Sequence, residues 1–150
     1  MNKVLKEDLT YLCDNFKEYE AFKGKTFLVT GATGLVGSVF TKALACANER
    51  YDLGITLILV VRDEARARLV FEDLGEAGQI IEYMVADMTD IELSTKISEL
   101  YPGSIDYIMH GASITASKQM VDTPVDTIHI AYAGTMNMLK LAIAKKSKVV

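Results

Sequence analysis

The feature that most constrains the fold of this chain is residues 27–38, which read Phe-Leu-Val-Thr-Gly-Ala-Thr-Gly-Leu-Val-Gly-Ser. The apolar run predicts a short strand, the three glycines predict a turn, and the pattern after them predicts an amphipathic helix. The Gly-x-x-Gly-x-x-Gly spacing is one residue wider in its first interval than the Gly-x-Gly-x-x-Gly fingerprint of dinucleotide-binding folds. The flanking strand and helix make the motif specific, and the alternative is a tight turn without a ligand.

Each glycine of this motif has a physical role in binding a dinucleotide. Gly31 can adopt the backbone angles of a tight strand-to-helix turn, and Gly34, without a Cβ, lets a pyrophosphate approach the main chain. Gly37 lets the helix lie close to the sheet. The start of the helix directs unpaired N–H groups and the positive end of its dipole at the phosphates. We therefore expect the cofactor to contact Gly31, Thr33, Gly34, Leu35, Val36 and Gly37.

Composition narrows the classes of protein to consider. A chain of 150 residues is about one domain long, and its formal net charge of −4 argues against a nucleic-acid partner. The two cysteines, Cys13 and Cys46, lack metal-ligand spacing and are expected to be reduced core residues, and no metal site is predicted. The first residues lack the apolar core of a signal peptide, and no apolar run could span a membrane. These features predict a cytoplasmic protein without a membrane partner.

The order of elements predicts an α/β fold. Strands are expected at 26–30, 55–61, 80–86 and 105–110, helices at 34–47, 64–74, 90–101 and 123–146, and a loop at 111–123. Alternating strands and helices predict a Rossmann-type doubly wound parallel sheet of order 3-2-1-4-5, with the ligand across the carboxyl ends of strands one and four. Residues 26–150 form this NAD(P)-binding domain. The sequence reaches only the start of strand five at Lys148, so the sheet is expected to be truncated there.

Helical periodicity predicts which faces are buried. Residues 1–25 are expected to hold an amphipathic helix over 4–20 and a linker, with packing against the sheet or a neighbouring helix favoured over a dimer contact. A homodimer stays compatible with the sequence. In helix 34–47 the expected buried side includes Leu35 and Val36. In the last helix, Thr123 is expected to cap the start, and Lys145 and Lys146 to suit the negative end. The buried residues expected there are Ile128, Tyr132, Met136, Leu139 and Ile143.

The residues after strand two bear on the choice of cofactor. If Arg62 takes the discriminating position, its guanidinium favours a 2′-phosphate and hence NADP, with Arg66 adding to the effect. If Asp63 reaches the ribose instead, NAD fits. A third interpretation is a solvated helix start in which Arg62, Asp63, Glu64 and Arg66 pair among themselves. The sequence favours NADP over NAD.

Two further strand ends carry candidate ligand residues. Asp87 follows strand three, where its carboxylate can accept from the adenine amino group while Met88 lies against the ring; the alternative is an Asp that caps the next helix. After strand four, Gly111 and Ala112 are small enough for the nicotinamide ribose to approach, and Ser113 is expected to contact the ligand. His110 is expected to be a hydrogen-bonded structural residue rather than an acid or base. His129 is expected on a helix surface.

Four segments together resemble the N-terminal part of an extended short-chain dehydrogenase/reductase, of the NAD-dependent epimerase/dehydratase family that acts on nucleotide sugars. The segments are 30–37, 87–90, 110–113 and 134–139. The resemblance implies that the first segment binds the pyrophosphate, that Asp87 holds adenine, and that the residues after strand four meet the nicotinamide half.

The chain departs from the family pattern at three points. Ala131 stands where the family has Asn, and Arg62 stands where NAD users commonly have Asp. The catalytic Ser/Thr and Tyr-x-x-x-Lys pair are expected beyond residue 150, because the only such spacing here, Tyr19 to Lys23, precedes the glycine motif. The resemblance therefore implies the cofactor-binding portion of a nucleotide-sugar epimerase or dehydratase, with no catalytic residue and no activity by itself. The alternatives are an NADP-dependent carbonyl reductase of the same superfamily and a non-catalytic NADP-sensing regulator.

Overall fold

The computed structural model describes all of residues 1–150 and contains one five-stranded parallel sheet. The strand order is β3-β2-β1-β4-β5, which confirms the predicted doubly wound topology. The strands are β1 (Thr26–Thr30), β2 (Thr56–Val61), β3 (Ile81–Val85), β4 (Tyr107–His110) and β5 (Lys148–Val149). All five run in the same direction, so their carboxyl ends share one edge of the sheet.

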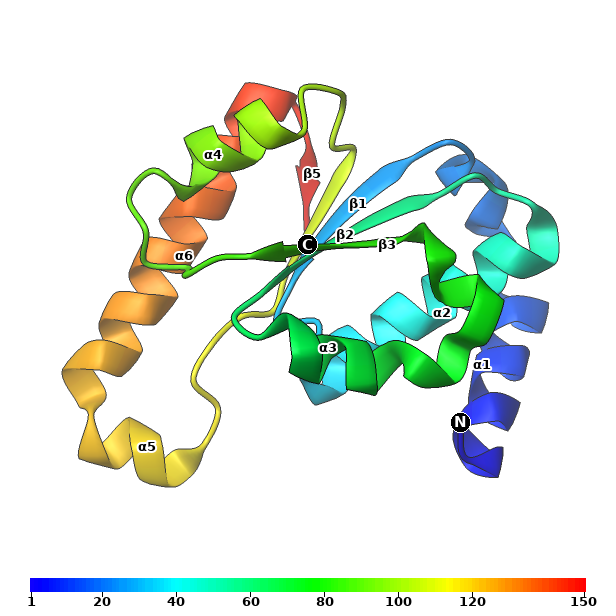
Figure 1. The fold of residues 1–150 in the computed structure, drawn as a ribbon, viewed down its shortest axis with the longest axis horizontal. Helices are drawn as coiled ribbons and strands as arrows, with labels where there is room; N and C mark the ends of the chain where they lie inside the picture. The colour runs from blue at the N-terminus through cyan, green and yellow to red at the C-terminus, as the bar shows by residue number, and fades with distance from the viewer.

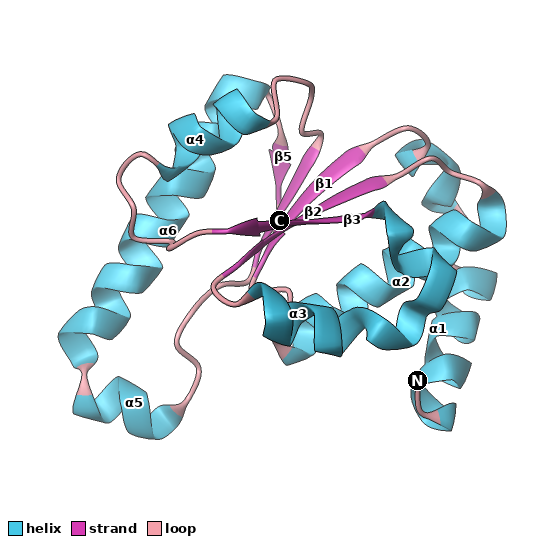
Figure 2. Ribbon diagram, in the orientation of Figure 1, coloured by secondary structure: helices cyan, strands magenta, loops and turns pink.

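Helices cover both faces of this sheet (Figure 1). The α-helices are α1 (Lys3–Asn15), α2 (Leu35–Tyr51), α3 (Glu64–Phe71), α4 (Leu93–Leu100), α5 (Ser117–Asp122) and α6 (Pro124–Lys145). Two 3₁₀ segments are η1 (Glu18–Phe22) and η2 (Glu72–Ile80). Figure 2 shows α1, α2 and α3 on one face, with α4 and α6 on the other. The short helix α5 lies in the segment for which the sequence indicated only a loop.

Two apolar cores result from the alternation of side chains along the strands. Phe27 and Val29 of β1 point into a cluster of 17 buried residues under α1, α2 and α3. Leu28, between them, points into a cluster of 11 buried residues under α4 and α6. Burial of each such side chain stabilises the fold by roughly 1.5–3 kcal/mol. β1 is therefore held rigidly from both faces, and the glycine turn that follows it starts from a fixed position.

The N-terminal helix is shorter than the predicted 4–20. It ends at Asn15, because Phe16 adopts extended backbone angles (φ −90°, ψ 109°). This break lets the Phe16 ring meet Tyr19 edge-on, with 4.7 Å between ring centroids. Tyr19 and Cys13 belong to the core cluster under α2, so α1 packs on a neighbouring helix as favoured from the sequence. The hydroxyl of Tyr51, at the end of α2, donates to the Cys13 carbonyl at 2.8 Å.

The predicted buried face of α6 is wrong. Ile128 and Ile143 have exposed fractions of 70% and 81%, and the other three residues expected inside are also partly or largely exposed. The buried face instead carries Gly134, Asn137, Met138, Leu141 and Ala142. Apolar residues occur on both sides of this helix, so periodicity alone could not choose between them. Small residues decide the choice, since a Cβ at Gly134 would lie only 3.4 Å from Met88 Cβ.

The ends of α6 also differ from expectation. The Thr123 side chain does not cap the helix, because its hydroxyl donates to the Gln119 carbonyl of α5 at 3.1 Å. The Lys145 amino group donates to the carbonyls of Tyr101 and Gly103 at 2.6 and 3.0 Å. Lys145 lies in the last turn of α6, as expected, and also neutralises carbonyls at the C-terminal end of α4. This contact ties the two helices of that face together.

Candidate functional site

The glycine turn has the geometry that the sequence predicts at Gly31 and Gly37. Gly31 has φ +68°, a left-handed conformation that favours glycine, and a Cβ there would overlap the Gly111 carbonyl. A Cβ at Gly37 would overlap the Gly31 carbonyl oxygen and lie 2.9 Å from Ala32 Cα. Gly37 therefore allows α2 to lie close to the turn itself. Gly31 in turn allows the ends of β1 and β4 to meet.

The first turn of α2 leaves main-chain donors without acceptors. Gly34 is the N-cap and offers no side-chain cap, and the Ser38 N–H makes the first helical bond, to the Gly34 carbonyl at 2.9 Å. The N–H groups of Leu35, Val36 and Gly37 therefore have no acceptor within the protein. Such donors, with the positive end of the helix dipole, form an anion-binding position.

Leu35 and Val36 do not lie on the buried side of α2 as expected. Their exposed fractions are 84% and 69%, because they face outward at the open end of the helix. They flank the unpaired donors, so their exposure is compatible with the ligand contact also expected of them. Thr33, in the turn, is half-buried, and its hydroxyl makes no hydrogen bond within the protein. The glycine turn thus presents unpaired polar groups beside exposed apolar ones.

The end of β4 is different, because its amides are already used. The Gly111 N–H donates to the Thr30 carbonyl at 3.1 Å, and the Ala112 N–H donates to Thr30 Oγ1 at 3.2 Å. Neither amide is available to a ligand, so Gly111 and Ala112 can contribute only their small size. Ser113 is exposed beyond them. This side of the crevice supplies shape rather than hydrogen-bond donors.

The residues after β2 differ in how far they are paired within the protein. Asp63 is the N-cap of α3, and its Oδ1 accepts from the Arg66 N–H at 2.9 Å. Glu64 pairs with Arg68, at 2.7 Å, and not with Arg66. Arg62 and Arg66 are both exposed and have no ion pair in the protein. The four charged residues at positions 62–66 therefore form no ion pairs with one another. The guanidinium groups of Arg62 and Arg66 are available to an anion.

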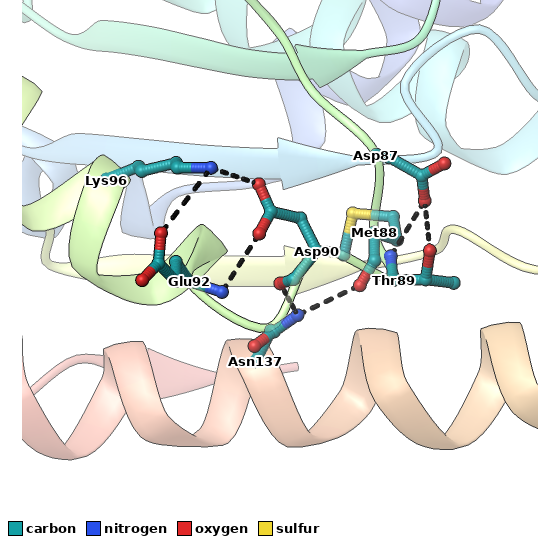
Figure 3. A network of polar contacts seen from close by, with 7 residues as sticks. All are labelled: Asp87, Met88, Thr89, Asp90, Glu92, Lys96 and Asn137. Atoms are coloured by element: carbon teal, nitrogen blue, oxygen red, sulfur yellow. Dashed lines mark hydrogen bonds and ion pairs between the residues drawn. The ribbon is translucent and has the colours of Figure 1, made fainter.

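Asp87 stands at the end of β3 and forms a local turn. Its Oδ1 accepts from both the N–H and the hydroxyl of Thr89, each at 2.8 Å (Figure 3). The backbone bond, then the hydroxyl bond and the positive charge of Arg62, hold the pKa of Asp87 below its ordinary value. Asp87 does not cap α4, which begins six residues later at Leu93. It is an ionised carboxylate beside Arg62 with one oxygen free of protein hydrogen bonds.

Met88 is not positioned as expected. Its side chain is buried in the core under α6, against Gly134, rather than exposed beside Asp87. Met88 lies in the turn that follows β3, and its side chain is directed toward α6. With 7% of its surface exposed, Met88 offers little area for the ring contact expected from the sequence.

Asn137 is a structural residue that the sequence analysis missed. It is buried on α6, and its Nδ2 donates to the carbonyls of Met88 and Asp90 at 2.9 and 2.8 Å (Figure 3). Lys96 pairs with Asp90 at 2.6 Å on the other side of the same loop. The loop after β3 is thus fixed from α6 and from α4. A lone amide inside an otherwise apolar helix face was the available signal.

His110 is a hydrogen-bonded structural residue, as expected from the sequence. Its Nδ1 lies 2.7 Å from Thr30 Oγ1, and burial lowers the pKa of the imidazole. His129 is exposed on α6, as predicted. No group of three or more His, Cys, Asp or Glu residues could hold a metal ion, and no helix is long and apolar enough to cross a membrane.

Together, the parallel sheet of order 3-2-1-4-5 and the open helix start after β1 define a dinucleotide-binding Rossmann-type domain. The sequence model of the NAD-dependent epimerase/dehydratase family matches residues 27–150. The chain belongs to this family. The family is described as NAD dependent.

Individual relatives include a reductase, a dehydrogenase and an epimerase. It is 32% identical over 93 residues to 3-oxoacyl-[acyl-carrier-protein] reductase FabG of Vibrio harveyi, covering 62% of this chain and 36% of that protein. It is 32% identical over 105 residues to a 3beta-hydroxysteroid dehydrogenase of Mediterraneibacter gnavus, covering 67% and 36%. The structure of epimerase Mth375 from Methanothermobacter thermautotrophicus matches with a TM-score of 0.67 and 27% identity, covering 93% and 37%. The chain thus spans about a third of the length of these relatives.

Proposed function

We propose that this chain binds the pyrophosphate of NADP at the start of α2. The observation that carries the proposal is the set of unpaired N–H groups of Leu35, Val36 and Gly37, at a helix end with no side-chain cap. Gly31 and Gly34 keep the turn free of side chains, and Thr33 adds a hydroxyl without a protein partner. The adenine half extends toward Asp87, whose free carboxylate oxygen can accept from the adenine amino group.

The preference for NADP rests on Arg62 and Arg66. Both guanidinium groups are exposed and unpaired beyond the end of β2, where the adenine ribose of a dinucleotide is bound in this fold. One oxygen of Asp63 accepts from the Arg66 N–H as the N-cap of α3, and the guanidinium groups are the cations at this position. Arginine pairs with phosphate bidentately, so a 2′-phosphate fits this position better than a hydroxyl does.

For the parent enzyme, the proposed activity is that of a nucleotide-sugar epimerase or dehydratase, located in the cytoplasm. Bound nicotinamide would supply hydride transfer at a sugar carbon. This chain would not catalyse the reaction alone. Its one Tyr-x-x-x-Lys spacing starts at Tyr19, which is buried in the aromatic cluster, where burial raises its pKa to about 12. A proton-abstracting tyrosine needs a pKa nearer to the working pH.

A second candidate is an NADP-dependent carbonyl reductase on the same scaffold. The free arginines favour it, because they fit a reductase that uses NADP, and the two relatives from Vibrio and Mediterraneibacter are named as a reductase and a dehydrogenase. A non-catalytic NADP sensor would bind equally well without turnover. A Tyr-x-x-x-Lys motif about 25 residues past Val150 would separate an enzyme from the sensor, as the family pattern places it there.

Calorimetric titration with NADP and NAD tests the cofactor assignment. Wild type is expected to bind NADP more tightly, and R62A is expected to bring the two affinities together, a loss of about tenfold for NADP. R68A is the matched control, because Arg68 belongs to the same helix but pairs with Glu64. Equal affinities of wild type and R62A for NADP would remove the role of Arg62. Absence of binding to either nucleotide would overturn the proposal.

The homodimer considered from the sequence stays a prediction. Its test is the mass of the purified chain by light scattering. Substituting the exposed apolar residues Ile128 and Ile143 of α6 with Ser should leave the fold intact, because neither side chain belongs to the core. A dimer in wild type that becomes a monomer in this variant would assign the contact to α6.

A further inference from the structure

His110 joins three elements at the carboxyl edge of the sheet. Its Nδ1 lies 2.7 Å from Thr30 Oγ1 at the end of β1. Its ring lies against α6, where a Cβ at Gly134 would be 3.4 Å from His110 Cε1. Thr30 is fully buried, with 0% of its surface exposed. The same Thr30 oxygen also accepts from the Ala112 N–H at 3.2 Å.

The single proton of the Thr30 hydroxyl determines which tautomer of His110 fits the structure. A hydroxyl has one proton and two lone pairs. Because one lone pair accepts from Ala112, the Thr30 proton can be paired only by donating it to His110 Nδ1. A neutral imidazole that accepts at Nδ1 carries its proton at Nε2. If Nδ1 were protonated, the buried Thr30 proton would lose its acceptor, which costs about 1–3 kcal/mol.

We propose that His110 is a positioning residue: in the Nε2–H tautomer it holds the Thr30 hydroxyl, and through it the Ala112 amide, so that protonation of His110 weakens dinucleotide binding. This inference rests on the proposed function, since the segment that Thr30 holds is the one expected to meet the nicotinamide half. Gly111 would be displaced together with Ala112, because its N–H is also bonded to Thr30.

No charged group opposes or assists this protonation. The ring bonds Thr30 of β1 and lies against Gly134 of α6, and neither residue titrates. The ionisable residues after β3 are Asp87 and Asp90, which are engaged with Thr89 and Lys96. Those on the other elements packed against β4 are Lys148 of β5, which lies over the Tyr107 ring, and Asp126, His129, Lys140 and Lys145 of α6. Burial alone lowers the pKa of His110 from 6.5.

The direction of the pH effect follows from this lowered pKa. Between the lowered value and 6.5, the unfolded chain binds the proton and the folded chain does not. The stability contributed by neutral His110 is therefore fully present above 6.5 and is lost as the pH falls from there through the lowered pKa. Dinucleotide affinity should fall through the lowered pKa itself, where the folded protein takes up the proton.

Nitrogen NMR of ¹⁵N-labelled histidine and NADP titration across pH 5–8 test the proposal together. Wild type is expected to show an unprotonated Nδ1 and to lose about tenfold in affinity as His110 is protonated. H110N should keep the affinity, because its amide oxygen accepts from Thr30, and should lose this pH dependence. T30V should raise the pKa of His110, while T30S should preserve it. Subtracting the H110N profile removes the titration of the 2′-phosphate.

H129N is the matched control, because His129 is exposed and should leave both readouts unchanged. The role of His110 would be overturned if its uncharged ring carried the proton at Nδ1 in wild type. Identical pH profiles of NADP affinity for wild type and H110N would overturn it as well. Absence of NADP binding by wild type at every pH would overturn the proposed function instead. In that case the tautomer and the effect of T30V on the pKa of His110 still decide whether the hydrogen-bond arrangement is correct.

Discussion

The start of α2 and the end of β4 lie at the same edge of the sheet, but the main-chain N–H groups are unpaired in the first and hydrogen-bonded in the second. The N–H groups of Leu35, Val36 and Gly37 have no partner in the protein. Those of Gly111 and Ala112 are both bonded to Thr30. The first region offers hydrogen-bond donors to a ligand, and the second offers a fixed surface.

The difference has a physical cause. The helix start is exposed at Leu35 and Val36, where water can take up the N–H groups until a ligand arrives, while Gly37 is buried against the turn. The β4 end packs against β1 and α6, where an unpaired amide would cost about 1–3 kcal/mol. Thr30 and Asn137 satisfy polar groups on that side, and no side chain caps the N–H groups that follow Gly34. The unpaired donors are therefore the groups that the proposed function assigns to the diphosphate, and the paired amides hold the scaffold.

The largest expected effect comes from the place where the two regions meet. Gly31→Ala would put a Cβ into the Gly111 carbonyl, at φ +68°. We expect a loss of about 3 kcal/mol or more in the free energy of unfolding, measured with urea. Gly24→Ala is the matched control, because Gly24 has φ +67° with nothing within 4 Å of its Cβ position. Equal losses in the two variants would mean that β1 and β4 do not approach this closely.

The next effect tests the paired side. Asn137→Leu would leave the carbonyls of Met88 and Asp90 without their amide donor. The free energy of unfolding should fall by about 2–3 kcal/mol, and hydrogen exchange in the loop after β3 should accelerate. Asn15→Leu removes an exposed amide bond to Tyr11 and should cost far less. Unchanged exchange in the loop would show that Asn137 does not fix it.

A smaller effect on stability, with a large one on binding, tests the unpaired side. Val36→Glu places a carboxylate at the first turn of α2, where it should stabilise the helix by about 0.3–1 kcal/mol through the dipole. The same charge should weaken dinucleotide binding tenfold or more, because it competes for the donors and repels phosphate. Val36→Gln is the control for side-chain size, because glutamine has nearly the size of glutamate without its charge. Binding by Val36→Glu as tight as that of wild type would place the phosphates elsewhere.

The smallest effect concerns Asp87. Thr89→Val removes one of its two hydrogen bonds and should raise the pKa of Asp87 toward its ordinary value of 3.8. Because the native pKa is lowered, the stability that Asp87 contributes is present above 3.8 and is lost as the pH falls through the lowered value. Thr89→Val should therefore reduce the stability that is lost at acid pH. Carbon NMR of the Asp87 carboxylate measures its pKa in both proteins. An unmoved pKa would contradict the bond.

The sequence predicted the glycine turn from local signals, and the strand order from the alternation of strands and helices together with the rule for doubly wound sheets. Strand alternation and the angles at Gly31 are determined by neighbouring residues, and they were correct. The buried face of α6 was wrong because apolar residues occur on both sides, and the choice depends on Gly134 meeting Met88.

The hydrogen-bond partners at the site could not be predicted in this way. Thr30 and His110 are 80 residues apart, and Asn137 and Met88 are 49 apart. Such pairs form only when the sheet brings distant strand ends together. Residue type indicated that Asp87 and His110 were polar residues at strand ends, but not which of their atoms stay free.

Amide NMR during titration with NADP tests the central claim most directly. The account predicts that the N–H signals of Leu35, Val36 and Gly37 shift strongly downfield as phosphate accepts their protons, while those of Gly111 and Ala112 keep their hydrogen-bonded positions. Saturable binding without a change in the three α2 signals would contradict it, because the diphosphate would then be held elsewhere.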